Sequence, residues 1–358
     1  MPPRAYTCGH TGALNQITGT FPGATSVTYL DGYFVFTAAE PTSKWFISGL
    51  LDPNAYDALD FAYTDGEPDL VRRVLTLHGE LWFVGDTSVE VWYDAGSSGL
   101  ESAPGTSFFP FRRRAGGVIE HGAESPKTVC ICDGSLFWLS DAGIVLRSNG
   151  YRAVRISTHA LEQKIRLLGI PAIAASLSYI QDGHTFYVLT FSSATSSATL
   201  VYDCTTQKWH ERSSSADGTA PWRPWSAYVT TGLSVFGDSL SGDLMFAQPY
   251  VDTDYGVPVR REVVLPPLWG QTRFAFCARV EVECDMGQAQ DPITLEWSDD
   301  GGFTFPRSRA LANRAAVGAR ARVYTTRLGS FRHRVFRLVL THGVTLYAVD
   351  ADIHGGTV

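Results

Sequence analysis

The sequence has 358 residues, of which 44% are apolar and 18% charged, and its formal net charge is −7. This length allows two or three domains whose cores are large enough to fold without disulfides or metals. The negative charge gives no support for binding nucleic acid over the whole surface, and no stretch approaches the ~20 apolar residues that a membrane helix needs.

A repeated hairpin runs through the first 250 residues. Each repeat has an apolar strand, a tight turn with glycine and a strand rich in aromatic residues. The five repeats are 29–37, 75–85, 129–141, 178–191 and 234–247, with turn glycines Gly32, Gly79, Gly134, Gly183 and Gly242. Their spacings are 47, 55, 49 and 59 residues. Such a period is typical of propeller blades, which cover one another's faces by stacking radially.

The sequence therefore predicts an all-β protein, with a β-propeller of about five blades over residues 26–250. Residues 1–25 form an N-terminal arm in this interpretation. A large sandwich with long insertions is the alternative, but the regular spacing of the repeats favours the propeller.

Two connections between repeats carry charged residues. Residues 57–69 hold Asp57, Asp60, Asp65, Glu67 and Asp69. Their spacing lacks the regularity of a calcium loop, so a solvated or interface loop is favoured over a cation site.

The second connection, 96–117, is long and combines aromatic with basic residues. It contains Phe108, Phe109, Phe111, Arg112, Arg113 and Arg114. Aromatic side chains beside arginine favour a surface that docks another protein. Contact with DNA phosphates is the alternative.

Helix is expected at one place, residues 158–168. Ser157 or Thr158 caps its start, and Leu161, Ile165 and Leu168 fall on one face. Gly169 and Pro171 end it.

The pattern changes after the turn-rich stretch 249–258. Residues 259–358 contain six or seven alternating strands, which predict a C-terminal β-sandwich. Residues 307–337 hold nine arginines and no acid, whereas residues 1–100 hold twelve acidic and four basic residues. This split suggests surfaces of opposite sign that meet, with a merely solvated basic face as an equally weighted alternative. The interface candidates in this domain are Arg320, Arg322, Arg332 and Arg334.

Residues 298–305 (SDDGGFTF) follow the Asp-box pattern, in which Ser298, Asp300 and Gly302 shape a tight turn between strands. The motif occurs in sialidases, where it is structural rather than catalytic. A single copy is weak support for an enzyme.

The sequence offers no catalytic, cofactor or metal site. It lacks a nucleophile elbow, a P-loop and a zinc-protease helix, and its nine histidines show no ligand spacing. Its six cysteines form no zinc pattern. Cys130 and Cys132 alternate on one strand, a poor arrangement for a disulfide, so the cysteines are expected as small core residues in a reducing cytosol.

Several stretches, in this order, resemble the packaged-DNA stabilisation proteins of short-tailed bacteriophages. They are 31–51, 52–69, 85–93 (GDTSVEVWY), 156–165 (ISTHALEQKI), 295–305 and 327–353. The start of the family's pattern has no counterpart here, so a first blade is either absent or supplied by another chain.

The resemblance implies a structural tail protein of the virion that is assembled in the host cytoplasm and is not an enzyme. Copies would form a ring, a hexamer in related tails, between the portal-adaptor protein and a needle, spike or fibre. The ring would extend the DNA channel and help retain packaged DNA, without specific DNA binding or membrane contact. A carbohydrate-binding or sialidase-like propeller is the alternative, motivated by the Asp-box.

Overall fold

The structure is a computed structural model. It describes residues 5–8, 12–17, 21–67, 69–96, 109–169, 175–193, 196–215, 218–230, 233–248, 251, 253–270, 274–285, 293–311, 319–341 and 343–355. Two compact units divide the chain: residues 1–212 with 223–247, and residues 213–222 with 248–358. Of the helices within the described ranges, none is long and apolar enough to cross a membrane.

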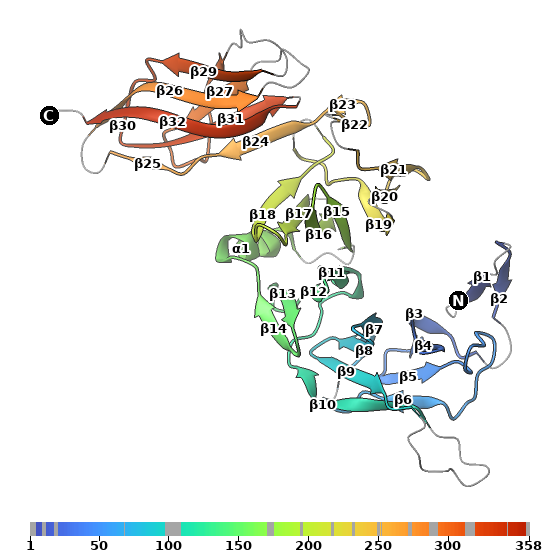
Figure 1. The fold of residues 1–358 in the computed structure, drawn as a ribbon. Coiled ribbons are helices and arrows are strands. Elements are labelled where there is room, and N and C mark those ends of the chain that lie inside the picture. Colours follow the sequence, from blue (N-terminus) through green and yellow to red (C-terminus); the bar gives the residue numbers. More distant parts are fainter. Residues whose placement is uncertain are drawn as a thin grey trace. The chain divides into compact units, whose positions relative to one another are not determined.

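The first unit consists of antiparallel sheets that follow one another along the chain, from blue to yellow in Figure 1. Blade 1 is β3 (Ala24–Leu30), β4 (Tyr33–Ala38), β5 (Lys44–Ile47) and β6 (Phe61–Tyr63). Blade 2 is β7 (Val71–Leu77), β8 (Glu80–Gly85), β9 (Val89–Asp94) and β10 (Phe111–Ile119). Blade 3 is β11 (Cys130–Cys132), β12 (Ser135–Leu139), β13 (Val145–Asn149) and β14 (Arg152–Arg155).

Blade 4 is β15 (Ala175–Gln181), β16 (His184–Ser192), β17 (Ser197–Asp203) and β18 (Lys208–Arg212). Blade 5 has three strands, β19 (Pro224–Thr230), β20 (Leu233–Asp238) and β21 (Leu244–Phe246). A separate hairpin precedes the blades, β1 (Tyr6–Cys8) with β2 (Leu14–Gln16). The short 3-10 helix η1 (Pro126–Thr128) lies between β10 and β11. These sheets confirm the predicted propeller fold.

Four of the five predicted hairpins have the expected turn. In the turns that contain Gly32, Gly79, Gly134 and Gly183, both central residues have positive φ. This is the type I′ geometry that Asp-Gly pairs favour, because its twist matches that of the flanking strands.

The fifth predicted hairpin was assigned to the wrong pair of strands within its blade. Gly242 lies between β20 and β21, the second and third strands of blade 5, and its φ is not positive. The first strand of this blade is β19, which the sequence pattern did not reveal. Both β19–β20 and β20–β21 are short hairpins, and local sequence does not say which of them begins a blade.

Apolar side chains join each blade to the next. Separate core clusters lie between blades 1 and 2, blades 2 and 3, and blades 3 and 4. Blades 4 and 5 meet where the rings of Tyr179 and Phe236 are 5.3 Å apart. Within the described residues, none of these clusters joins blade 5 to blade 1.

Hydroxyl groups add polar links between the blades. Thr28 Oγ1 in β3 lies 2.8 Å from Thr76 Oγ1 in β7, and Ser178 Oγ in β15 donates to the Ile131 carbonyl in β11. Ser234 Oγ in β20 donates to the Ile180 carbonyl in β15. A hydroxyl group can donate to a carbonyl of the neighbouring blade, so serine and threonine suit these positions.

The helix α1 (His159–Leu168) follows blade 3 as predicted. Thr158 caps it, since its hydroxyl accepts a hydrogen bond from the Leu161 amide. Ile165 is fully buried between blades 3 and 4, with Leu161 and Leu168 packed beside it.

The second unit is a β-sandwich, as predicted. One sheet contains β24 (Arg260–Val264), β25 (Leu268–Trp269), β27 (Ile293–Ser298), β28 (Arg307–Leu311) and β31 (His333–Thr341). The other contains β26 (Ala275–Asp285), β29 (Arg320–Thr326), β30 (Ser330–Phe331) and β32 (Thr345–Gly355). One core cluster fills the space between them. The hairpin of β22 (Thr253–Asp254) and β23 (Val257–Pro258) precedes the sandwich, and Ser214 donates to Asp254 within this unit.

Candidate interaction surfaces

The connection expected at 96–117 is in part a strand. Residues 97–108, Phe108 among them, lie outside the described residues. From Phe111 the chain forms β10, the outermost strand of blade 2, whose one partner among the described strands is β9. The pairing shifts register between Arg113 and Val118. Arginines on an edge strand are one way in which proteins prevent unwanted strand pairing, and they also present charge to a partner.

The two described phenylalanines of this segment face inward. Phe111 is fully buried, with its ring 5.9 Å from Trp45 and 5.8 Å from Tyr33. Phe109 is partly buried against the same cluster, 5.1 Å from Trp45. They hold blade 2 against blade 1, so the prediction that Phe111 contributes to a docking surface was wrong.

The three arginines of β10 differ in what they contact. Arg112 and Arg113 are exposed. Arg112 donates to the carbonyls of Phe109 and Phe111. Arg114 is half-buried, forms an ion pair with Glu80, and lies over the ring of Tyr93 at 4.8 Å.

Glu80 and Tyr151 extend the contacts of Arg114 to blade 3. The Tyr151 hydroxyl donates to both carboxylate oxygens of Glu80 at 2.9 Å. The hydrogen bond with Glu80 raises the pKa of Arg114, whereas burial and Glu80 raise the pKa of Tyr151. Sequence reasoning missed Glu80, a carboxylate that opens a strand of otherwise buried side chains. Arg114 thus stabilises the joint between blades 2 and 3.

A polar cavity of about 760 Å³ opens between the blades beside Glu80 and Tyr151. Arg147 and Arg155 also line it. Arg155 is held by Glu162 of the helix, with Nε 2.7 Å from Oε1.

A second buried carboxylate holds the acidic connection in place. Glu90 of β9 accepts hydrogen bonds from the indole of Trp92 and from the Gly66 amide. Burial raises the pKa of Glu90, although both hydrogen bonds and the nearby Arg113 oppose this. Glu90 is the glutamate of the 85–93 stretch quoted above, and its partner in the 57–69 segment was not foreseen.

Part of the 57–69 cluster is structural. The Asp69 carboxylate accepts hydrogen bonds from the amides of Asp86, Thr87 and Ser88. Asp57 caps the Leu59 amide, while Asp65 and Glu67 are exposed. Among the described residues, no three His, Cys, Asp or Glu side chains gather as metal ligands.

The basic run of the sandwich is largely paired within its own unit. Arg320 and Arg322 are exposed on β29, and both form ion pairs with Glu283 of the neighbouring strand β26. Arg322 also lies 3.8 Å from Glu281. Arg332 is exposed and lies over the Phe274 ring at 4.6 Å. The acidic residues that pair with these arginines therefore include glutamates on a strand of the same domain.

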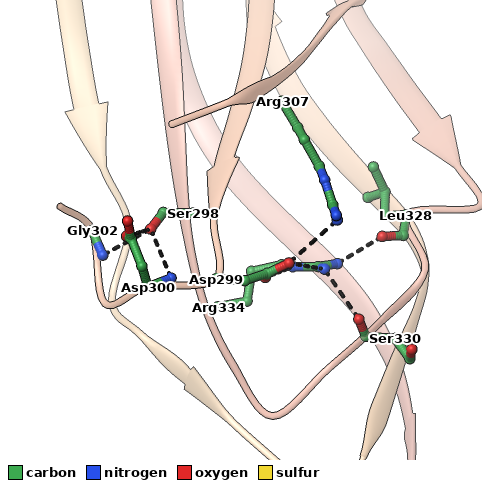
Figure 2. A network of polar contacts seen from close by, with 8 residues as sticks. All are labelled: Ser298, Asp299, Asp300, Gly302, Arg307, Leu328, Ser330 and Arg334. Carbon is green, nitrogen blue, oxygen red and sulfur yellow. Dashed lines mark hydrogen bonds and ion pairs between the residues drawn. The ribbon is translucent and has the colours of Figure 1, made fainter. Parts of the chain in front are cut away.

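Arg334 is a core residue, so the prediction that it forms an interface was wrong. Its side chain is 0% exposed. Figure 2 shows its guanidinium against Asp299, with donor distances of 2.6 and 2.9 Å, and against the carbonyls of Leu328 and Ser330 at 2.7 and 3.3 Å. A guanidinium that is fully buried and already donates four hydrogen bonds presents no surface to a partner protein.

The Asp-box forms the turn that the motif predicts. Ser298 Oγ accepts a hydrogen bond from the Gly302 amide at 2.9 Å (Figure 2). Asp300 accepts hydrogen bonds from the amides of Phe303 and Thr304. Hydrogen bonds from Ser298 and Thr304 hold the pKa of Asp300 well below its usual range. The neighbouring Asp299 is the partner of Arg334, so the turn also anchors the buried ion pair.

Comparison with known proteins gave one family and several distant folds. The model of the family described as bacteriophage P22 Gp10, beta-propeller, matches residues 5–247. No curated protein sequence matched the chain.

Solved structures that resemble the chain do so weakly. One is exo-β-1,3-galactanase from Phanerochaete chrysosporium with galactose, at 10% identity and a TM-score of 0.34, covering 96% of this chain and 100% of that one. Another is Hsv2 from Kluyveromyces lactis, at 12% identity and a TM-score of 0.29, covering 58% and 65%.

Proposed function

Since the chain belongs to the bacteriophage P22 Gp10 β-propeller family, we propose that it is a structural, non-enzymatic subunit of a phage tail. In this role copies form a ring below the portal-adaptor complex, extend the DNA channel and help retain packaged DNA. The ring contacts a needle, spike or fibre at its other side. The observation that carries the proposal is that the family match spans the part of the chain that folds into the five blades.

The outer edge of blade 2 is the surface that we assign to subunit contact. In the described part of the chain β10 has a strand partner on one side only, and Arg112 and Arg113 project from it. Exposed arginine is enriched where proteins meet, because its planar group pairs with carboxylates and carbonyls. An acidic surface on a neighbouring copy or tail protein suits this edge.

The sandwich is a weaker candidate for the same role. Glu281 and Glu283 offset the charge of Arg320 and Arg322, and Arg334 is buried. Of the four arginines proposed there, Arg332 is exposed and has an aromatic contact rather than a carboxylate partner among those described.

The test is charge reversal at β10. Arg112→Glu combined with Arg113→Gln removes the basic edge and leaves Arg114 with Glu80. Glutamine is chosen at 113 because a carboxylate there would lie near the buried Glu90. We expect roughly 10-fold weaker ring formation, measured by native mass spectrometry or sedimentation, with an unchanged unfolding temperature.

The matched control makes the same charge change elsewhere. Arg152→Glu with Lys208→Gln alters exposed residues on β14 and β18, the outer strands of blades 3 and 4. Equal assembly by the two double variants would refute the role of β10. A monomeric wild-type chain in assembled tails would refute the ring itself.

A further inference from the structure

Two buried cysteines face each other across the joint between blades 3 and 4. Cys132 ends β11, and Cys204 follows β17. Their sulfur atoms are 3.5 Å apart although the residues are 72 positions apart in the sequence. Cys132 is 2% exposed and Cys204 8% exposed, and both belong to the core cluster that joins the two blades.

We propose that Cys132 and Cys204 form a disulfide that links blade 3 to blade 4 once the protein leaves a reducing cytosol. A disulfide needs the sulfurs about 2.05 Å apart. From 3.5 Å, the remaining approach is roughly 1.5 Å, which small side-chain rotations supply. Cytosolic glutathione and thioredoxin keep such thiols reduced, whereas a particle released from the cell meets oxidants.

The surroundings of the pair make Cys204 the attacking sulfur. The hydrogen bond with Cys132 lowers the pKa of Cys204, and Arg147 adds to this effect, although burial opposes it. The same hydrogen bond with Cys204 raises the pKa of Cys132. Of the two thiols, Cys204 therefore ionises more readily, and the thiolate is the form that attacks an oxidant.

The backbone holds Cys204 in position for this reaction. The Cys204 amide donates to the Thr185 carbonyl, and the preceding Asp203 accepts hydrogen bonds from the amides of Thr205 and Thr206. Ordered neighbours on both sides reduce the entropy lost when the bond forms.

The cavity of about 760 Å³ described above lies close to the pair, although neither cysteine is among the residues that line it. Its lining includes Ser135, which pairs with Cys132 in the β11–β12 hairpin, and Tyr202, two residues before Cys204. A peroxide is small enough to approach the pair from this cavity.

The reaction with hydrogen peroxide balances in two steps. The Cys204 thiolate attacks one peroxide oxygen, which gives a sulfenic acid and hydroxide. Cys132 Sγ then attacks the sulfenic sulfur, loses its proton and releases water. The hydroxide from the first step takes up the proton that Cys204 lost on ionisation. Overall two thiols therefore lose two electrons and two protons, and one peroxide becomes two waters.

The bond would fasten two blades that are otherwise held by packing and hydrogen bonds. It closes a long loop and therefore restricts the unfolded chain strongly. Release from the reducing cytosol rests on the proposed tail function, whereas the cross-link itself forms within one chain and is tested on the purified protein alone.

The experiment starts from full-length protein purified with a reducing agent and then freed of it. After treatment with dilute hydrogen peroxide at neutral pH, non-reducing peptide mapping should show Cys132 joined to Cys204. The intact mass should fall by two hydrogens, and the unfolding temperature should rise by roughly 5–15 °C and return on reduction.

Three variants test the assignment. Cys132→Ser and Cys204→Ser should lose the cross-link and the thermal shift, whereas Cys130→Ser, on the same strand, should retain both. Joining of Cys130 to either residue in the wild type would overturn the proposal. So would sulfinic acid at Cys204 with no cross-linked peptide, a result that requires only the wild-type chain.

Discussion

Replacing Arg334 with methionine tests how much the ion pair between Arg334 and Asp299 contributes to the stability of the sandwich. Methionine keeps much of the length and the apolar stem but removes every donor. It leaves the Asp299 carboxylate and the carbonyls of Leu328 and Ser330 without the guanidinium (Figure 2).

The expected loss follows from the burial of the two partners. Removing one partner of a buried ion pair typically costs about 3–5 kcal/mol, because the other charge stays buried and unpaired. Arg334 is fully buried, but the Asp299 side chain is 37% exposed and also lies 3.4 Å from Arg307. Water and Arg307 therefore recover part of the loss, and we expect about 2–4 kcal/mol.

Thermal denaturation of the full chain, followed by calorimetry, measures the effect on the sandwich transition. A loss of this size should lower that transition by roughly 10 °C. Arg332→Met is the matched control, since Arg332 is exposed two residues earlier and its ring contact with Phe274 contributes about 1 kcal/mol or less. If the two variants unfold within about 1 kcal/mol of each other, the buried pair does not stabilise the sandwich.

Three further predictions address other parts of the chain. Phe111→Ala should destabilise the propeller by about 3–5 kcal/mol in urea denaturation, and Phe109→Ala by clearly less, because Phe111 is fully buried; equal effects would contradict the assigned burial. Ser298→Ala should cost about 1–2 kcal/mol, since it removes the acceptor of the Gly302 amide, and an unchanged sandwich transition would contradict this. Burial opposes the ionised form of Asp203, but hydrogen bonds from Thr206 and His184 outweigh it and lower the pKa to about 2. The stability that these hydrogen bonds contribute is therefore fully present above 3.8, the ordinary pKa of an aspartate side chain, and is lost as the pH falls through about 2. In acid denaturation, Asp203→Asn should remove this pH dependence of the free energy of unfolding. An unchanged loss of stability at low pH in the variant would contradict the prediction.

The comparison between β10 and the sandwich arginines shows which interface candidates remain exposed in the folded chain. Arg112 and Arg113 are exposed as expected. Phe111 and Arg334 were assigned to the same kind of surface, yet both are buried. A basic or aromatic residue in a strand can contact either a partner protein or another part of the same chain. The strand that packs against it decides which of the two occurs.

Glu80 and Glu90 are buried residues whose structural role sequence reasoning missed. Each lies within a run of buried apolar residues, and its partners come from other segments: Arg114 and Tyr151 for Glu80, and Gly66 for Glu90. A carboxylate in such a run is a usable signal, because burial requires partners. The partners themselves depend on which blades stack.

The alternating pattern and the Asp-Gly turns were enough to predict an all-β chain with a propeller and a sandwich. Those features depend on side-chain direction and backbone φ over a few neighbouring residues, so the local sequence determines them. Tertiary structure alone decided the register of the fifth blade, the burial of Arg334 and the meeting of Cys132 with Cys204. Each of these depends on residues distant in the chain that come together only when sheets pack, and no local preference encodes that pairing.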